Sequence, residues 1–378
     1  MLLIALLESV LGTGFGLDQA PGFDRTGAYL SLTTGPSGLT FNYADGGAGR
    51  DVEPAVYWFA ARHRRGEWLV GEERLLSREL EGDGPRGRFF PLLLLWRRDA
   101  GTPDFSRLPL HWSSEGSVPV ALHRSSWTNP DAVFAAIKAG SPSGPHGHMD
   151  IGSFVLDAGG VRWAADLGAE SYHRIESRGM NFWSMAQDSE RWRVFRQGSL
   201  SHNTLVIDGT LQKASGSGTI VRFSGASEFP HTVVDMTGVY AGQAGAVHRG
   251  LALLPDGGVL VRDRLTGLRP GAEVRWGMVT PASPGLAGGD VLQLRQGTAS
   301  LSLRILQPGA MKWTLLDTAT PRNEWDSPNP GTVMCAFTAL APADGTLDLA
   351  VMLAPGIRRP DDVAPALLKP PSEWRAVR

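Results

Sequence analysis

The spacing of hydrophobic residues changes near residue 115 of the chain. Before that point, apolar side chains recur every three or four residues, which is the period of a helix with one buried face. The pattern predicts helices over residues 55–63 and 89–96, joined by loops rich in glycine and proline. The apolar run over residues 1–7 lacks a basic start and a small-residue cleavage site, so we predict a buried helix there rather than a signal peptide.

After residue 115, hydrophobic and polar residues alternate in short segments that end at Gly, Pro, Asp or Asn. This period of two is typical of strands with one buried face. No helix of useful length separates the segments, which disfavours a parallel sheet. The predicted strands are residues 118–122, 132–136, 152–158, 161–165, 204–207, 232–235, 251–254, 259–263, 274–278, 301–306 and 347–353.

The two patterns together predict an α+β protein of two domains, with helices over residues 1–114 and a large antiparallel β-sandwich over residues 115–378. A membrane-spanning helix needs about 20 apolar residues. The richest apolar run, residues 89–96, is much shorter, so we expect no membrane span.

Composition narrows the classes of function. The chain has 36 Lys and Arg against 38 Asp and Glu, a formal net charge of −2, and its basic residues form no block. We therefore expect no nucleic-acid partner. Cys335 is the single cysteine, which excludes an intrachain disulfide and a metal cluster held by thiolates.

A glycine pair in the middle of the chain predicts a tight hairpin. The dipeptide Gly159-Gly160 lies between two predicted strands and suits a two-residue turn that needs positive φ at both positions. If Ala158 pairs with Val161, the same register places Ser153 opposite Asp166. The hairpin would then return the Asp166 carboxylate to the loop that precedes its first strand.

Histidines gather around this hairpin. His146 and His148 lie in the preceding loop, and His202 comes just before another predicted strand. Two imidazoles and the Asp166 carboxylate form a donor set that Zn²⁺ accepts. A glycine separates His146 from His148, so the two would not easily bind one ion together, and His146 is better placed to face a substrate. A substrate-binding loop without metal remains an alternative.

These residues carry a resemblance to the heparinase II/III-like family of polysaccharide lyases. The resemblance spans roughly residues 10–265, and its histidine motifs are its most specific part. The segments that carry it are 146–154, 166–168 with Tyr172, 201–205, 249–254, 261–265 and 41–47. It implies an incomplete (α/α) toroid followed by an antiparallel β-sandwich, in agreement with the pattern of hydrophobic residues.

The resemblance also implies a reaction. Members of this family cleave polysaccharides that contain uronic acids, such as heparan sulfate or alginate, by β-elimination. By resemblance, His146 is the catalytic histidine, and His148, Asp166 and His202 bind one structural zinc ion. The reaction needs a base, an acid for the leaving oxygen and neutralisation of the uronate charge, for which Tyr and His are suited.

The remaining site candidates are a tyrosine and groups that would bind substrate. Tyr172 follows Asp166 along the chain, and Tyr43 lies in the loop over residues 41–47, so either is a candidate for the catalytic tyrosine. Asn42, Arg124 and Arg174 are candidates for binding substrate, the arginines through bidentate contacts with uronate or sulfate groups.

The short helical region leaves alternatives open. Family members have a longer helical domain, so the toroid is reduced here or the sequence begins at an internal methionine. A second hypothesis is a catalytically silent, zinc-containing module that binds carbohydrate. A third is a zinc hydrolase with Asp150 as its base. The expected partner is an acidic polysaccharide or oligosaccharide, and a homodimer is left open. Family resemblance implies a periplasmic or secreted protein, although no leader is predicted.

Overall fold

The computed structural model describes residues 1–82, 87–356 and 368–375. The chain divides into two compact units. The first, here the helical unit, contains residues 1–40 and 49–109. The second, the β unit, contains residues 41–48 and 110–378. The loop Phe41–Ala48, which was predicted to belong to the helical domain, belongs in the structure to the β unit.

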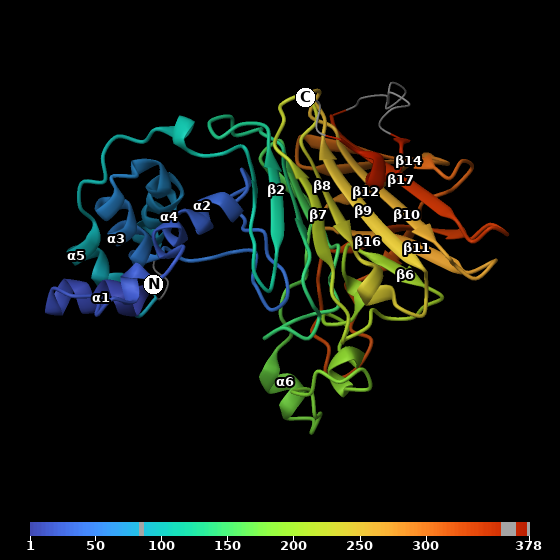
Figure 1. The fold of residues 1–378 in the computed structure, drawn as a ribbon, viewed down its shortest axis with the longest axis horizontal. Coiled ribbons are helices and arrows are strands. Elements are labelled where there is room, and N and C mark those ends of the chain that lie inside the picture. The colour runs from blue at the N-terminus through green and yellow to red at the C-terminus, as the bar shows by residue number, and fades with distance from the viewer. Residues whose placement is uncertain (83–86, 357–367, 376–378) are drawn as a thin grey trace. The chain divides into compact units, whose positions relative to one another are not determined.

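The helical unit is built from short helices (Figure 1). Its longest buried element is α3, which begins where Glu53 caps the first turn and Pro54 occupies the first helical position. It ends at Arg64, which has a left-handed backbone with φ of 50°. The helices of this unit are α1 (Leu2–Leu11), α2 (Tyr29–Thr33), α3 (Pro54–His63), α4 (Val70–Glu81) and α5 (Leu93–Trp96).

Two helix predictions needed correction in their details. A helix does form at the start of the chain, but Ala5 is the one buried residue of α1, and Leu3 and Val10 are exposed. The prediction of a buried helix was wrong because an apolar run specifies burial only where other elements cover all its faces. Residues 89–96 form a 3₁₀ turn, η4 (Phe90–Leu92), followed by α5.

The described residues of the β unit form three antiparallel sheets. Their strand orders are β1-β2-β3-β4-β5, β12-β13-β14-β17-β10-β9-β8-β7 and β15-β16-β11-β6. Figure 1 shows β7 to β10 of the largest sheet side by side. The strands are β1 (His111–Ser113), β2 (Val120–Arg124), β3 (Phe134–Lys138), β4 (Phe154–Ala158), β5 (Val161–Ala164), β6 (Leu205–Ile207), β7 (Thr219–Ser224), β8 (His231–Asp235), β9 (Ala246–Leu253), β10 (Val259–Thr266), β11 (Glu273–Thr280), β12 (Ser283–Gly288), β13 (Val291–Gln296), β14 (Ala299–Gln307), β15 (Thr314–Asp317), β16 (Val333–Leu340) and β17 (Leu347–Pro355).

One hydrophobic core joins the three sheets, which makes the β unit sandwich-like. Ile137 from the first sheet, Val261 from the second and Trp276 from the third belong to the same buried cluster. Every predicted strand overlaps an observed one, so the α+β class with a large antiparallel β-sandwich is confirmed. Six strands were not predicted, namely β1, β7, β12, β13, β15 and β16.

The predicted hairpin is β4 and β5. Ala158 pairs with Val161 as predicted, around Gly159 and Gly160, which both have positive φ. The register then shifts between Leu156 and Asp157, because a bulge inserts one extra residue in β5. The ladder ends before it reaches Ser153, so the predicted pairing of Ser153 with Asp166 was wrong.

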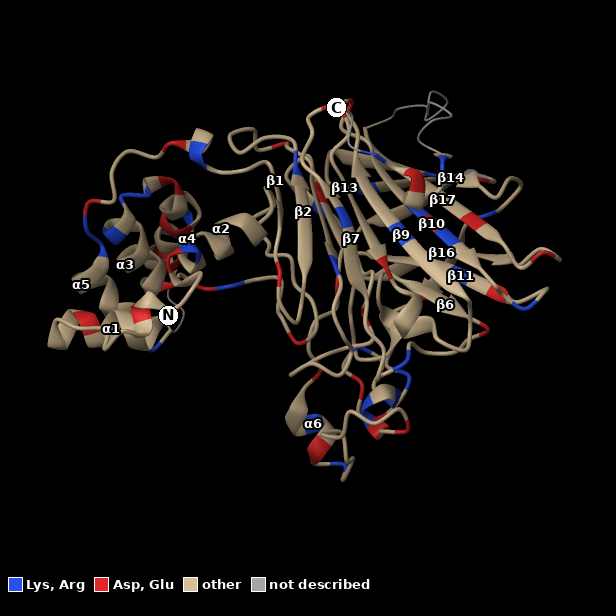
Figure 2. Cartoon of the chain, in the orientation of Figure 1, with Lys and Arg blue, Asp and Glu red and all other residues tan. Residues whose placement is uncertain are grey.

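A buried ion pair crosses the centre of the largest sheet, where basic and acidic positions lie next to each other in β9 and β10 (Figure 2). Arg249 donates to both carboxylate oxygens of Asp263, and its other nitrogen donates to the carbonyls of Gly152 and Asn203. Such a pair is tolerated in a core because every group is satisfied. Arg249 also holds the backbone carbonyl of Asn203, the residue that follows His202. No helix among the described residues combines the length and apolar character needed to cross a membrane.

Candidate functional site

The candidate site lies wholly within the β unit. Its central feature is the loop Phe41–Ala48, here the Asp45 loop, which is fixed to the sandwich at two points. The amide nitrogen of Asn42 donates to the backbone carbonyl of Asp166 at 3.1 Å, and the backbone N–H of Ala44 donates to the Asp150 carboxylate at 2.9 Å. Asp150 is itself buried and paired with Lys138.

The Asp45 carboxylate contacts three side chains at once. Its Oδ2 accepts from the Tyr172 hydroxyl and lies 2.8 Å from Nδ1 of His146. Its Oδ1 lies 3.0 Å from Nε2 of His148. His146 Nδ1 is also 2.8 Å from the Tyr172 hydroxyl, and the two rings stack at 6.2 Å between centroids. Three of the predicted site residues therefore meet at a carboxylate that the sequence analysis did not select.

The contacts with Asp45 determine which ring nitrogen of His146 and of His148 carries the proton. An ionised carboxylate can only accept hydrogen bonds. The nitrogens that face Asp45, Nδ1 of His146 and Nε2 of His148, must therefore carry the proton in the neutral rings. The lone pair of His146 then lies on Nε2, on a side chain that is 63% exposed. A histidine held in this way can accept a proton from a bound molecule.

The Asp45 contacts also shift two pKa values. Burial alone would raise the pKa of Asp45, but hydrogen bonds from His148, Tyr172 and His146 outweigh it and lower the pKa to about 2. Burial, together with the bond to Asp45, raises the pKa of Tyr172 to about 12. At neutral pH the carboxylate is therefore ionised and the phenol holds its proton.

The backbone of the histidine loop is strained where it presents His146. This residue has φ of 56°, in the left-handed region that non-glycine residues rarely adopt. The next residue must be glycine, since a Cβ on Gly147 would lie 2.1 Å from the carbonyl oxygen of Pro142. The buried guanidinium of Arg191 donates twice to the Gly147 carbonyl and holds the loop in place.

His148 and His202 lie against each other below this surface. Both are fully buried, and their ring centroids are 5.4 Å apart. Nδ1 of His202 lies 2.7 Å from the Asp166 carboxylate, whose other oxygen accepts from the N–H of Gly168. Burial lowers the pKa of His148, whereas for His202 the Asp166 carboxylate outweighs burial and raises the pKa.

The imidazoles of His148 and His202 have some of the features of a metal site. Nδ1 of His148 and Nε2 of His202 are buried and have no hydrogen-bond partner within the part of the chain that the structure describes. The opposite nitrogen of each ring faces a carboxylate, which is the outer-shell arrangement usual for histidines that bind metal. Asp166 contacts His202 rather than completing a three-ligand set, and no group of three donors suited to a metal occurs among residues 1–82, 87–356 and 368–375.

The other predicted site residues lie in different surroundings. Tyr43 packs against Phe41, with the Lys138 ammonium 5.5 Å from its ring centroid. Arg124 is buried with its guanidinium over the Trp127 ring, and burial lowers its pKa to about 10.

Arg174 lies on α6 (Tyr172–Glu176) and donates to the carbonyl of Asp326 at 3.3 Å. The amide nitrogen of Asn42 is taken up by two backbone carbonyls. Substrate binding by Asn42, Arg124 and Arg174 stays a prediction. Asp150, the proposed base of a zinc hydrolase, is buried in its pair with Lys138, which is a poor position for that role.

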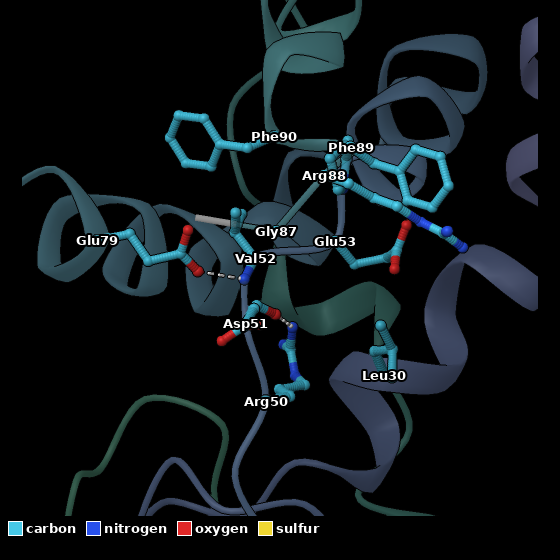
Figure 3. Close-up of a pocket in the computed structure, with 11 residues that line it drawn as sticks. Leu30, Arg50, Asp51, Val52, Glu53, Glu79, Gly87, Arg88, Phe89 and Phe90 are labelled. Carbon is cyan, nitrogen blue, oxygen red and sulfur yellow. Dashed lines mark hydrogen bonds between the residues drawn. The ribbon is translucent and has the colours of Figure 1, made fainter. Parts of the chain in front are cut away.

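A pocket of about 400 Å³ occurs elsewhere, in the helical unit. Figure 3 shows that it is lined by Glu53, Glu79, Arg88 and Phe89 among others, and that the Glu79 carboxylate accepts from the backbone N–H of Val52. No predicted site residue lines this pocket. His146, His148 and Tyr172 lie at the Asp45 loop instead.

Comparison with known proteins agrees with this architecture. Residues 121–350 match the family model described as heparinase II/III-like, C-terminal. A mutant of the heparan sulfate lyase HepC from Pedobacter heparinus is similar in structure, with a TM-score of 0.61 and 13% identity, over 88% of this chain and 46% of that one. A heparinase III has a TM-score of 0.60 and 13% identity, over 92% of this chain and 50% of that one.

At this level of identity the likeness shows the fold. The chain spans about half the length of these two solved structures. No curated protein matches the sequence.

Proposed function

Because the chain belongs to the heparinase II/III-like family, we propose that it is a polysaccharide lyase that cleaves glycans containing uronic acids by β-elimination. The observation that carries the proposal is the junction of His146, Tyr172 and Asp45 on one surface of the β unit. It places a histidine with an exposed lone pair next to a phenol that holds its proton.

The reaction needs two proton transfers. A base removes the proton from the ring carbon next to the uronate carboxylate, the bond to the glycosidic oxygen breaks, and an acid protonates that oxygen. The electron pair of the C–H bond becomes the new C=C bond, so no oxidant or reductant is consumed. Negative charge develops on the uronate during the first step and must be neutralised.

We assign the base to His146 and the acid to Tyr172. With a pKa of about 12, Tyr172 is a proton donor at neutral pH and a poor base. Nε2 of His146 takes the proton from carbon, and the resulting imidazolium also offsets the charge on the uronate. Tyr172 gives its proton to the leaving oxygen.

The contact between His146 and Tyr172 allows the starting protonation state of the site to be restored. His146 Nδ1 and the Tyr172 oxygen are 2.8 Å apart, so the imidazolium can pass its Nδ1 proton to the phenolate, which leaves a neutral ring with its proton on Nε2. Release of the Nε2 proton to water and uptake of a proton from water at Nδ1 then restore the starting tautomer, because this side chain is exposed. Asp45 stays ionised throughout and keeps both rings in position.

We also propose that His148 and His202 bind one Zn²⁺, with Asp166 and Asp45 orienting the two rings. The unpartnered buried nitrogens support this assignment. When bound, the ion would brace the loop that carries His146, and the chemistry described above does not pass through it.

The substrate class is a polymer of uronic acid with another sugar, as in heparan sulfate, or of uronic acid alone, as in alginate. An ultraviolet assay for the unsaturated uronate product, on alginate, heparan sulfate, chondroitin and hyaluronan, tests the proposal. We expect product from at least one polymer, and its loss in His146→Asn, because asparagine tolerates the left-handed backbone at this position.

The alternative that the sequence leaves open is a catalytically silent module that binds carbohydrate. No product from any of the four polymers, together with retained binding of one of them, would replace the lyase with this module.

A further inference from the structure

Trp183 is an exposed aromatic ring beside the reacting pair. Its side chain is 58% exposed, although large apolar side chains are normally covered. Single exposed apolar residues are common and need no explanation. Trp183 differs from these because it is held in place from several sides and touches Tyr172.

Two neighbours and one hydrogen bond fix the indole ring. Its Nε1 donates to the Glu176 carboxylate at 3.1 Å. The ring of Phe182, which is fully buried, lies 4.7 Å away between centroids. The Tyr172 ring lies 5.3 Å away at 87°, so an edge of one ring meets the face of the other. Binding to such a ring costs little conformational entropy, because the ring is already ordered.

The position of Trp183 links it to the chemistry. Tyr172 contacts Trp183 through its ring, while its hydroxyl contacts His146 and Asp45. A polymer whose leaving oxygen meets the Tyr172 hydroxyl can therefore extend over the exposed indole. The face of a pyranose ring carries axial C–H groups, and it packs well on a flat apolar surface.

We propose that Trp183 is a sugar-binding subsite, which stacks on the pyranose ring next to the bond that is cleaved. This inference rests on the proposed lyase function and adds the element that positions the polymer. A platform binds the substrate before and during reaction alike, so its removal weakens binding more than it slows the chemical step.

The test compares Trp183→Ala, Trp183→Phe and the control Leu340→Ala, which shortens an apolar side chain of similar exposure on β16. On the polymer that the protein cleaves, we expect Trp183→Ala to raise KM about tenfold, with kcat within about twofold of the wild type. Trp183→Phe should recover part of the loss, and the control should change neither constant.

Two results would overturn the subsite. One is an unchanged KM in Trp183→Ala. The other is a fall in kcat with an unchanged KM, which would mean that Trp183 acts by holding Tyr172.

A lack of turnover in the wild type would instead overturn the lyase. In that case, calorimetric titration of the same variants with oligosaccharides of the four polymers decides the subsite. Binding that is weakened about tenfold by Trp183→Ala supports it, and binding that is equal in both proteins, or absent from the wild type, excludes it.

Discussion

At the scale of single residues, the Asp45 carboxylate determines what the neighbouring side chains can do. It fixes the protons of His146 and His148 and receives the Tyr172 hydroxyl. An asparagine has the same shape but offers one acceptor atom and two N–H donors, which would face groups that are themselves donors.

We therefore predict that Asp45→Asn lowers kcat about a hundredfold, a magnitude typical of impaired acid–base catalysis. KM should change little, because Asp45 lies beneath the two rings and is only 16% exposed. Steady-state kinetics on the cleaved polymer measures both constants. Asp344→Asn serves as the control, and kcat equal to that of the control would remove Asp45 from the mechanism.

Removal of one oxygen atom from each tyrosine distinguishes the two candidates for the catalytic tyrosine. Tyr172→Phe removes the hydroxyl that contacts His146 and Asp45, whereas Tyr43→Phe removes one from a ring that packs on Phe41 and Lys138. We expect kcat to fall at least a hundredfold in the first variant and to stay within about threefold in the second. The opposite order would transfer the acid to Tyr43.

Sequence motifs identified three residues of the site, but no motif identified Asp45, which contacts all three. His146, His148 and Tyr172 stand out as polar residues near the hairpin, and the structure brings all three together. Asp45 precedes His146 by 101 positions, and nothing in the local pattern links the two. The loop over residues 41–47 was singled out by resemblance, but its tyrosine and asparagine drew attention rather than its carboxylate.

At the scale of elements, a buried histidine links two sheets. His123 on β2 lies 3.2 Å from His111 on β1 and 2.8 Å from the Thr232 hydroxyl on β8. Its ring also stacks on Phe223 of β7. Burial lowers the pKa of His123 well below its usual value, and the nearby imidazoles of His111 and His231 lower it further.

This shift predicts an acid-sensitive interface. Below about pH 6.5, His123 binds a proton in the unfolded chain but not in the folded one, so stability falls as the pH falls. The contribution approaches about 1.4 kcal/mol for each pH unit. His123→Phe keeps a ring against Phe223 but cannot titrate, so its unfolding free energy should depend less on pH between about 6.5 and 5.

Chemical denaturation at several pH values measures the slope. Exposed His173, replaced by Gln, is the control and should keep the slope of the wild type. Equal slopes in His123→Phe and the wild type would mean that the folded protein protonates this site without cost.

Strands that are well buried were predicted more readily than strands that are exposed. β3 and β4 are buried at every position, and both were predicted. β7 and β15 are mostly uncovered, and both were missed. The bulge near Trp163 could not be predicted, because the alternation of β5 looks the same with or without one extra residue.

At the scale of the whole molecule, a bound metal would add to stability. If Zn²⁺ binds Nδ1 of His148 and Nε2 of His202, ligand at a hundred times its Kd adds about 2.7 kcal/mol. We predict that saturating zinc raises the Tm by about 5 °C over chelator-treated protein. In His148→Gln and His202→Gln the response to zinc, rather than the Tm itself, should disappear. A zinc-independent Tm with no bound metal in elemental analysis would exclude the site.

The order of helices followed by strands was visible in the sequence, because the two periods differ. The assignment of the Asp45 loop to the β unit could not be predicted from the sequence, because the segments on both sides of the loop belong to the helical unit. Long-range contacts assign it to the β unit, because Asn42, Ala44 and Asp45 all contact partners more than a hundred residues away.

Because the Asp45 loop lies upstream of the sandwich in the sequence, recombination between genes can separate the two. The family match begins at residue 121, whereas the Asp45 carboxylate is encoded well upstream of it. A recombination event that joined a gene at the start of the matched segment would transmit the histidines and Tyr172 but leave Asp45 behind. Exchange of the sandwich between lineages should therefore yield active offspring only when the upstream stretch over residues 41–48 travels with it.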